Sequence, residues 1–179
     1  MIKSSRMRLR NGGPNDATGT LALLDGAVAW LVSRGRTGQW GSKGYSERPP
    51  AVERIHEYMR DHLVRVAEDE GDRVVGVAVL SEQAPKYAPP PSERELYVRL
   101  MVTDRAHSGS GIGAALIADA VAETRRRGIS LLRVDCYAGD DRKLVAQYVR
   151  LGFRETVPFE VSLPEDGALW PGQILEMRV

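Results

Sequence analysis

The chain has 179 residues, 42% of them hydrophobic and 27% charged, which suits one folded domain over residues 1–179 with a sizeable core. Its formal net charge of +1 excludes the strongly basic class of nucleic-acid-binding proteins, and no apolar run reaches the roughly 18 residues of a membrane span, so we expect neither partner. The single cysteine, Cys136, rules out an internal disulfide and fits a reducing compartment. Residues 1–6 lack the apolar segment of a signal peptide, and together these observations predict a cytoplasmic protein.

The first half of the chain predicts one strand, two helices and an antiparallel strand pair. Residues 7–10 are a short strand candidate, and the helix that follows them stops at Gly35. Pro49 opens the second helix, since proline is well tolerated in a first helical turn. The hydrophobic pattern then changes to that of strands over residues 63–67 and 74–80, which a tight hairpin joins.

The second half of the chain alternates strands and helices. Its predicted elements are, in order, a strand at 95–102, a helix at 112–127, a strand at 131–137, a helix at 142–151, and strands at 153–161 and 174–179. A strand, a helix and a strand in succession form a parallel crossover, whereas hairpins pair their strands antiparallel. The sequence therefore predicts an α/β fold whose mixed, mostly antiparallel sheet contains one parallel crossover and carries flanking helices.

A glycine-rich turn precedes the long helix of this second half. The turn consists of Ser108, Gly109, Ser110, Gly111, Ile112 and Gly113. Glycines at alternate positions leave the backbone bare, so that a ligand can approach its N–H groups closely. A helix N-terminus adds unpaired N–H groups and a positive dipole. The turn is therefore predicted to bind an anion, and a phosphate suits it best.

The same stretch has a second interpretation, as an NAD site. Gly109, Gly111 and Ala114 match the glycine fingerprint of dinucleotide-binding proteins, and Asp135 follows where that fingerprint has an acid. Two features count against this interpretation. Six residues, 103–108, separate the strand from the first glycine, although the turn of that fold is tight. Only 44 residues follow Asp135, which are too few to complete its sheet.

Three segments of the second half resemble the GNAT superfamily of N-acetyltransferases, which use acetyl-CoA. The strand at 96–102 with the glycine-rich turn resembles the family's pyrophosphate motif, and residues 132–136 resemble its neighbouring strand. Residues 144–153 are similar to its tyrosine-bearing helix and the Leu-Gly-Phe that ends it. The resemblance implies a GNAT-like fold and an enzyme that transfers an acetyl group from acetyl-CoA to a primary amine of a small molecule or peptide. Dimers are common in the family, so a homodimer is one expected assembly.

The resemblance also implies roles for individual residues. Transfer would be direct, in a ternary complex, with the pantetheine arm of acetyl-CoA lying between the two parallel strands. A bulge in the first of these strands would aim a backbone N–H, from Met101, Val102 or Thr103, at the thioester carbonyl. Tyr148 stands at the family's position for the general acid that protonates the CoA sulfur.

Fewer signals point to the base and to the acceptor pocket. Glu95 lies at the start of the strand that would carry the thioester, and it is the candidate general base by position alone. Asp135 faces either solvent or the acceptor, and the sequence leaves both open. Trp40 and Tyr45 fall in the loop that often walls the acceptor pocket in the family, so both are candidate substrate contacts.

The chain departs from the family's pattern at three positions. Ser108 stands where the family usually has Arg or Gln, and Ser110 where it often has a basic residue, so less positive charge faces the pyrophosphate. Nearby cations are candidates to replace that charge, namely Arg105, His107, Arg142 and Lys143. Asp141 replaces the usual Asn at the head of the tyrosine-bearing helix, near the expected pantetheine arm. It can cap the helix but cannot donate an amide hydrogen bond.

The reduced charge keeps a second function open, that of a non-catalytic acyl-CoA-binding module of the same fold. NAD binding, on the glycine fingerprint, is the third. No metal site is expected, because His56 and His62 are six residues apart and share no helix face.

Overall fold

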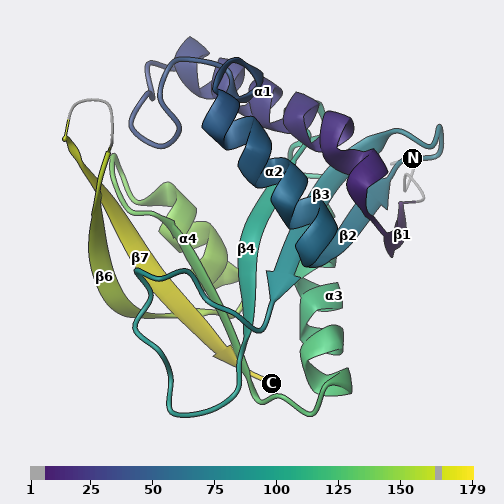
Figure 1. The fold of residues 1–179 in the computed structure, drawn as a ribbon, viewed down its shortest axis with the longest axis vertical. Coiled ribbons are helices and arrows are strands. Elements are labelled where there is room, and N and C mark those ends of the chain that lie inside the picture. The colour runs from purple at the N-terminus through teal and green to yellow at the C-terminus, as the bar shows by residue number, and fades with distance from the viewer. Residues whose placement is uncertain (1–6, 164–166) are drawn as a thin grey trace.

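The computed structural model describes residues 7–163 and 167–179, so that the segment 1–6, for which no signal peptide is predicted, lies outside them. Figure 1 shows the helices and strands of this part of the chain. Its helices are α1 (Ala17–Ser33), α2 (Pro49–Asp61), α3 (Ile112–Arg126) and α4 (Lys143–Arg150), with short 3-10 turns η1 (Pro14–Asp16), η2 (Tyr45–Glu47) and η3 (Arg105–His107). Its strands are β1 (Arg8–Asn11), β2 (Leu63–Glu68), β3 (Val74–Ser81), β4 (Leu96–Thr103), β5 (Leu131–Tyr137), β6 (Arg154–Ser162) and β7 (Leu169–Arg178).

The strands form one sheet in the order β1-β2-β3-β4-β5-β7-β6. Among the described strands, β4 and β5 pair in parallel and all other neighbours pair antiparallel. Helix α3 connects β4 to β5, which confirms the predicted parallel crossover and the mixed, mostly antiparallel sheet. A sheet of this kind is not the doubly wound parallel sheet of dinucleotide-binding proteins, so the fold excludes that interpretation of the glycine-rich turn.

The last strand is longer than the sequence predicts. The prediction began it at residue 174, whereas β7 begins at Leu169 and includes Pro171 and Gly172. These two residues pair on one side with β6, and Gly172 also pairs with Tyr137 of β5. Proline and glycine disfavour strands locally, but pairing on both sides outweighs a weak local preference.

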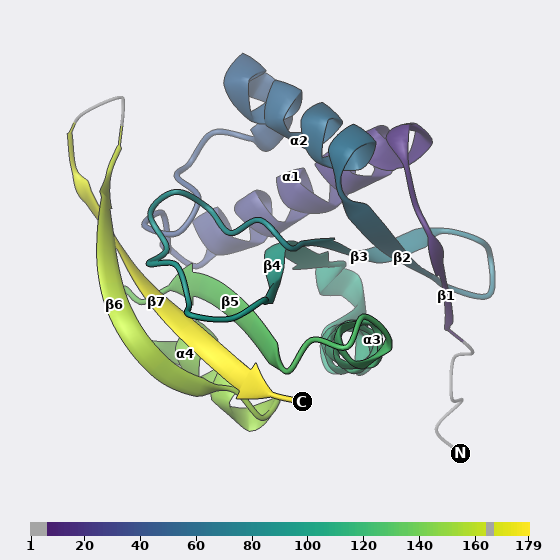
Figure 2. The ribbon, with the colours of Figure 1, turned by 60° about the horizontal axis from the view of Figure 1, so that its bottom comes forward.

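Helices cover both faces of the sheet (Figure 2). Helices α1 and α2 lie on one face, where Leu24 packs in a buried cluster with Val77. Helices α3 and α4 lie on the opposite face, where Ile117 packs in a second cluster with Val134. Two packed layers bury both faces of the central strands, which explains why these strands are nearly continuous apolar runs.

Strands β4 and β5 separate soon after they begin. Their parallel ladder consists of three pairs, from Leu96 with Leu132 to Val98 with Val134. Directly beyond it, β4 contains a bulge, because Leu80 of β3 pairs with Val98 and the preceding residue of β3 pairs with Leu100. The predicted bulge therefore lies at residue 99, where an unmatched residue bends β4 away from β5.

A glycine lets helix α3 approach the sheet closely at its first turn. Gly76 of β3 lies beneath Ile112, and a Cβ atom at Gly76 would come within 2.6 Å of the Ile112 Cγ2 atom and 3.1 Å of Leu116 Cδ1. Both side chains are buried. The absence of a side chain at Gly76 thus fixes the position of the α3 N-terminus on the sheet.

We therefore expect Gly76→Ala to destabilise the protein by about 1–3 kcal/mol, the usual cost of overpacking a core. Chemical denaturation measures this loss. The matched control is Gly26→Ala in α1, where an added Cβ meets no atom within 4 Å and alanine is the better helix former. Equal stability of the Gly76 variant and the original protein would show that α3 does not depend on this close approach.

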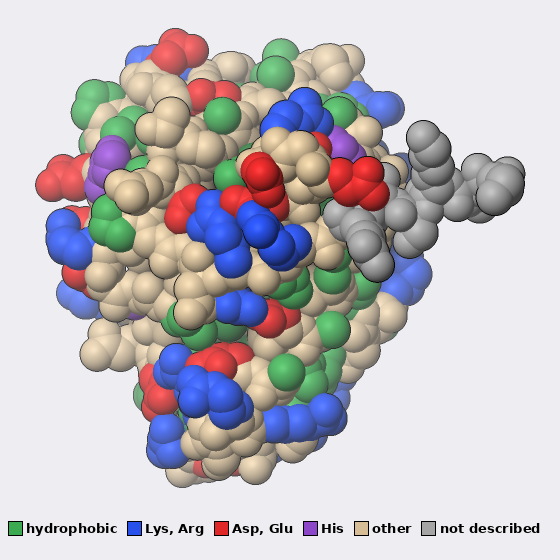
Figure 3. Space-filling model, turned by 90° about the vertical axis from the view of Figure 1, so that its right-hand side faces the viewer, with side chains coloured by type: hydrophobic (Ala, Val, Ile, Leu, Met, Phe, Trp, Pro, Cys, Tyr) green, Lys and Arg blue, Asp and Glu red, His purple; other side chains and the backbone are tan. Residues whose placement is uncertain are grey.

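The surface shows no region of a single charge on the face seen in Figure 3, where basic and acidic side chains are intermixed. Elsewhere in the described residues, too, opposite charges pair directly, as in the contacts of Arg8 and Arg10 with Glu68 and of Arg65 with Asp119. In the part of the chain that the structure describes, no helix is both long and apolar enough to span a membrane.

Candidate functional site

The gap between β4 and β5 exposes backbone groups of β4. The Asp104 N–H donates to the Val75 carbonyl of β3 at 2.8 Å, and N–H groups of an antiparallel strand alternate between its two sides. The Val102 N–H is therefore directed at β3, whereas the N–H groups of Met101 and Thr103 are directed into the gap. Of the three predicted oxyanion donors, the register thus favours Met101 and Thr103.

The glycine-rich turn lies where β4 ends and α3 begins. Gly109 and Gly111 have φ angles of 80° and 84°, which favour glycine because a side chain would be strained there. The N–H groups of Gly109, Gly111, Ile112, Gly113 and Ala114 donate to no acceptor within residues 7–163 and 167–179. Free N–H donors at a helix N-terminus suit an anion, and the anion site at this turn stays a prediction.

Most of the cations near this turn already have acidic partners. His107 contacts Asp104 at 3.1 Å, Arg142 pairs with Glu155, and Lys143 contacts Asp141 at 3.2 Å. Ser110 and Ser108 are exposed, and the Ser110 hydroxyl donates to the His107 carbonyl.

Arg105 is the exception among the candidate cations. Its guanidinium lies 4.1 Å from the centre of the Trp30 ring, and Arg34 stacks on the same ring at 4.4 Å. Neither arginine forms an ion pair with any carboxylate of the described residues. Partial burial lowers the pKa of Arg105, and the Arg34 charge adds to that effect. Arg105 therefore keeps its positive charge without an acidic partner in the described residues, and it belongs to η3, which directly precedes the glycine-rich turn.

Asp141 lies at the head of α4, as predicted, but its carboxylate is occupied. It pairs with Arg36 at 2.7 Å and accepts a hydrogen bond from the Lys143 N–H at 3.1 Å. The N-cap position of α4 is nevertheless Arg142, because the helix begins one residue later than predicted, so the prediction of Asp141 as the cap was wrong. The contact with Arg36 is the largest of the effects that hold the pKa of Asp141 well below its usual range. Asp141 therefore joins α4 to the loop after α1, rather than standing free for a ligand.

Tyr148 of α4 packs on the face of the sheet that carries α3. It is 6% exposed, belongs to the same cluster as Cys136, and meets Phe153 edge-on with ring centres 5.7 Å apart. Burial raises the pKa of its hydroxyl, and the nearby Cys136 and Asp135 raise it further. The hydroxyl has no hydrogen-bond partner in the described part of the chain, so a neutral donor is available there.

Asp135 of β5 faces the opposite side of the sheet, since it lies between Val134 and Cys136 and side chains alternate along a strand. Its Oδ2 atom accepts hydrogen bonds from the hydroxyls of Tyr97, at 2.6 Å, and Tyr87, at 3.0 Å. Burial raises the pKa of the carboxyl despite these hydrogen bonds. The sequence left the direction of the Asp135 side chain open, and in the structure its carboxylate points toward the hydroxyls of Tyr97 and Tyr87.

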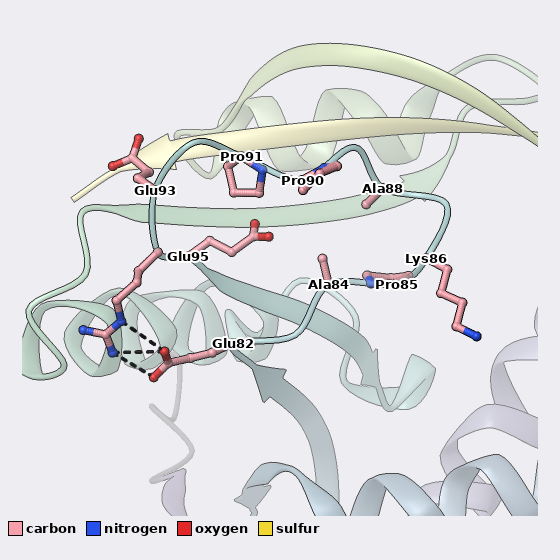
Figure 4. Close-up of a pocket in the computed structure, with 10 residues that line it drawn as sticks. Glu82, Ala84, Pro85, Lys86, Ala88, Pro90, Pro91, Glu93 and Glu95 are labelled. Carbon is pink, nitrogen blue, oxygen red and sulfur yellow. Dashed lines mark hydrogen bonds and ion pairs between the residues drawn. The ribbon is translucent and has the colours of Figure 1, made fainter.

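Glu95, the predicted base, is 5% exposed and forms a two-point ion pair with Arg133. Arg133 also donates to the Pro89 carbonyl at 3.0 Å, so the pair fastens the loop of residues 82–95 to β5. Figure 4 shows Glu95 beneath this loop, lining a hollow of about 430 Å³. Glu95 thus lies before the first pair of the β4–β5 ladder, whereas the gap opens after the last pair, which is Val98 with Val134. Glu95 and the gap are therefore at opposite ends of the ladder.

Trp40 and Tyr45 pack against the α1–α2 cluster and contact each other edge-on at 6.0 Å between ring centres. Arg48 stacks on Tyr45 at 4.4 Å, and burial raises the pKa of the Tyr45 hydroxyl. The loop also touches β7, because the Trp170 indole donates to the Gln39 carbonyl at 2.8 Å. Trp40 and Tyr45 therefore belong to a packed loop on the same face as Asp135.

The aromatic side chains of that face form a continuous row that the sequence does not reveal. Tyr87 stacks on Phe159 with ring centres 4.8 Å apart, Phe159 meets Trp170 at 6.1 Å, and Trp170 meets Tyr137 at 5.4 Å. These residues come from a loop and three strands. The row joins the loop of residues 82–95 to the β6–β7 hairpin.

Cys136 is not suited to covalent catalysis, because burial raises the pKa of its thiol to about 12 and the reactive thiolate is then scarce. Within the described residues, no three His, Cys, Asp or Glu side chains are arranged to hold a metal ion.

Tyr97 is a functional candidate that sequence reasoning missed, and Tyr87, an aromatic residue of the proline-rich loop, meets the same carboxylate. Tyr97 pairs with Arg133 in the parallel ladder, which places it diagonal to Asp135 on the same face. That register was the missing signal, because a crossover fixes the direction of two strands but not their alignment.

Comparisons with known proteins agree with this geometry. The family model described as the acetyltransferase (GNAT) family matches residues 27–153. The fold is similar to a GNAT-family acetyltransferase from Listeria monocytogenes, with 18% identity, a TM-score of 0.69, and coverage of 97% of this chain and 95% of that one. It is also similar to the yncA protein of Salmonella typhimurium, solved with its cofactor acetyl-CoA, with 16% identity, a TM-score of 0.63 and coverage of 96% and 93%. A third similar structure is the ribosomal-protein-S18-alanine N-acetyltransferase of Escherichia coli, with 14% identity, a TM-score of 0.67 and coverage of 97% and 94%. No curated protein matches the chain in sequence.

Proposed function

Because the chain belongs to the GNAT acetyltransferase family, we propose that it transfers an acetyl group from acetyl-CoA to a primary amine of a small molecule or peptide, directly and within one ternary complex. One observation carries the proposal. A turn with five free N–H donors stands at the start of α3, and a gap between β4 and β5 opens beside it. Acetyl-CoA has an anionic pyrophosphate and an extended pantetheine arm that carries amides. To bind both parts, a protein needs a set of N–H donors next to an open strand edge.

The residues present fit acetyl-CoA. The free N–H groups from Gly109 to Ala114 would hold the pyrophosphate, and their backbone donors do not depend on side chains at Ser108 and Ser110. The β4 edge in the gap would pair with the pantetheine amides in the manner of an added strand. Met101 or Thr103 would donate its N–H to the thioester carbonyl as that oxygen gains negative charge.

Tyr148 would serve as the general acid for the departing sulfur. A thiolate leaves with a proton affinity near that of a phenol, so a neutral tyrosine is a suitable donor. Burial keeps the Tyr148 hydroxyl in its neutral form, so that it can donate a proton. The same burial would disfavour a charged thiolate beside it, so the departing sulfur would take up that proton. The buried thiol of Cys136 leaves direct attack by the amine as the simpler route.

Arg105 supplies the charge that Ser108 and Ser110 lack. We expect Arg105→Ala to weaken acetyl-CoA binding by about 10- to 150-fold, since a charged hydrogen bond contributes roughly 1.5–3 kcal/mol. Calorimetry measures this change, and Arg60→Ala is the control because Arg60 is exposed and pairs with Asp61 at the far end of α2. Equal affinities of the two variants would mean that the backbone donors alone hold the phosphates.

The acceptor would enter from the face that carries α1 and α2, opposite Tyr148. Trp40 and Tyr45 lie on that face and remain proposed acceptor contacts, together with the aromatic row that ends at Tyr87. The same proposal includes a cytoplasmic location, which the composition of the chain favours. It also includes a homodimer, because dimers are common in the family.

A turnover assay tests the proposal. Purified protein is incubated with acetyl-CoA and a panel of primary amines, amino acids and peptides, and released CoA thiol is measured. Amine-dependent release above the rate with water is the expected result. Tight acetyl-CoA binding without release for any amine would instead support the non-catalytic acyl-CoA-binding module.

A further inference from the structure

We propose that Asp135 is the general base that takes the proton from the acceptor amine, and that Tyr97 and Tyr87 hold its carboxylate in place for this. The inference rests on the proposed acetyl transfer and adds to it the residue that faces the nucleophile. It differs from the prediction made from sequence, which placed the base at Glu95.

The position of Asp135 in the sheet is the first observation. The parallel ladder ends at Val98 and Val134, so Asp135 is the first residue of β5 beyond it. Arg99, the bulge residue, occupies the same level on β4. Asp135 therefore stands at the point where the two strands part, next to the β4 segment whose N–H groups enter the gap.

The hydrogen bonds of the carboxylate are the second observation. Both tyrosine hydroxyls donate to the same oxygen, Oδ2, at 2.6 Å from Tyr97 and 3.0 Å from Tyr87. Within residues 7–163 and 167–179, the other oxygen, Oδ1, accepts no hydrogen bond. A carboxylate fixed through one oxygen and free at the other is oriented like a catalytic base, because its free lone pair has a set direction.

The two tyrosines are themselves firmly placed. Tyr97 is fully buried and packs with Ala88 and Ile174, and Tyr87 stacks on Phe159. Tyr87 belongs to the loop of residues 82–95, which Arg133 fastens through the Pro89 carbonyl. The supporting shell thus comes from a strand and an anchored loop, which limits the movement of the carboxylate.

The charged side chains near Asp135 are engaged with other groups, so that its carboxylate stays available to accept a proton. From β4, Arg99 exerts an attraction on it but forms no ion pair with it among the described residues; Arg99 instead donates to the Gln83 carbonyl at 2.8 Å and lies over Tyr58 of α2. Arg133, on the same strand, is occupied by Glu95. On the other face, Tyr148 and Cys136 are neutral, and the β7 partner of Asp135 is the apolar Ile174.

The amine nitrogen forms a bond to the thioester carbonyl carbon and gives one proton to Asp135 Oδ1. The carbon–sulfur bond breaks, and the sulfur receives a proton from the Tyr148 hydroxyl. Solvent then takes the proton from Asp135 and returns one to Tyr148, so that the products are an acetamide and CoA thiol. The charge of Asp135 also raises the pKa of the Tyr148 hydroxyl, which keeps that hydroxyl protonated until the sulfur leaves.

The test is steady-state turnover of Asp135→Asn with acetyl-CoA and the most reactive amine of the panel. We expect kcat to fall at least about 100-fold, within the usual contribution of general-base catalysis, with acetyl-CoA affinity unchanged. The matched control is Asp72→Asn in the β2–β3 turn, where the side chain is exposed and asparagine tolerates the positive φ of 58°.

The pH profile separates a base from a merely structural residue. Activity rises with pH as the base loses its proton, and the hydrogen bond from Tyr97 lowers the pKa of Asp135. Tyr97→Phe should therefore shift the acidic limb of kcat/KM to higher pH, and Tyr87→Phe should shift it less because its hydrogen bond is longer.

The activities of these variants either support or overturn the assignment of Asp135 as the general base. Loss of turnover in Asp135→Asn together with the shifted limb in Tyr97→Phe would support the assignment. Turnover of Asp135→Asn within threefold of the original protein, or an unmoved limb in Tyr97→Phe, would overturn it and leave acetyl transfer intact. Absence of turnover by the unaltered protein with every amine would overturn the proposed function and the base together.

Discussion

Replacing Arg133 with alanine is expected to lower the free energy of unfolding by about 3–5 kcal/mol, the range for removing one partner of a buried ion pair. Arg133 and Glu95 have side chains only 8% and 5% exposed, and the variant would leave the Glu95 carboxylate buried without its partner. The Pro89 carbonyl would lose a hydrogen bond at the same time. Chemical denaturation with an unchanged slope measures the loss.

A double variant separates the charge from the packing. Arg133→Met with Glu95→Gln removes both charges and keeps most of the volume, so it should be clearly more stable than Arg133→Ala. If Arg133→Ala lost less than about 1 kcal/mol, the pair would behave as a solvated surface contact. Glu95 would then again be free to serve as a base.

The second large effect is expected at Tyr148. Tyr148→Phe should lower kcat about 100-fold with the best amine, because proton transfer to a leaving group typically contributes 10²–10⁴-fold. Affinity for acetyl-CoA and the free energy of unfolding should change little, since the hydroxyl makes no hydrogen bond in the described residues and the ring stays packed on Phe153. Steady-state kinetics, calorimetry and denaturation on the same preparation test all three statements.

A structural role for Tyr148 would give a different pattern. In that case Tyr148→Phe would keep full turnover, while Tyr148→Ala would lose stability by opening a cavity beside Phe153. Turnover of the phenylalanine variant within threefold of the original would therefore remove Tyr148 from the reaction.

Much of the fold could be predicted from local signals. The strand at 131–137 agrees with β5 at both ends, and the helix predicted to start at residue 112 starts there, since a glycine turn before an apolar helical pattern is a clear boundary. The parallel crossover followed from the order of strand, helix and strand. The bulge came from the family resemblance, and its place at residue 99 had to come from the pairing with β3.

The site was less predictable because its contacts depend on register. Glu95 is 38 residues from Arg133, and no sequence pattern indicates that the two meet across a parallel ladder. Asp135, Tyr97 and Tyr87 converge for the same reason, from one crossover and one loop. Arg36 occupies Asp141 over a separation of 105 residues. Such pairs are set by tertiary packing, which local spacing does not encode.

Calorimetric titration of the purified protein with acetyl-CoA, with NAD in a parallel titration, tests the central claim most directly. We predict saturable binding of acetyl-CoA at one site per chain and no binding of NAD. Absence of acetyl-CoA binding to the folded protein would contradict the claim, because the free N–H groups of the glycine-rich turn and the gap between β4 and β5 would then not form the site we assign to them.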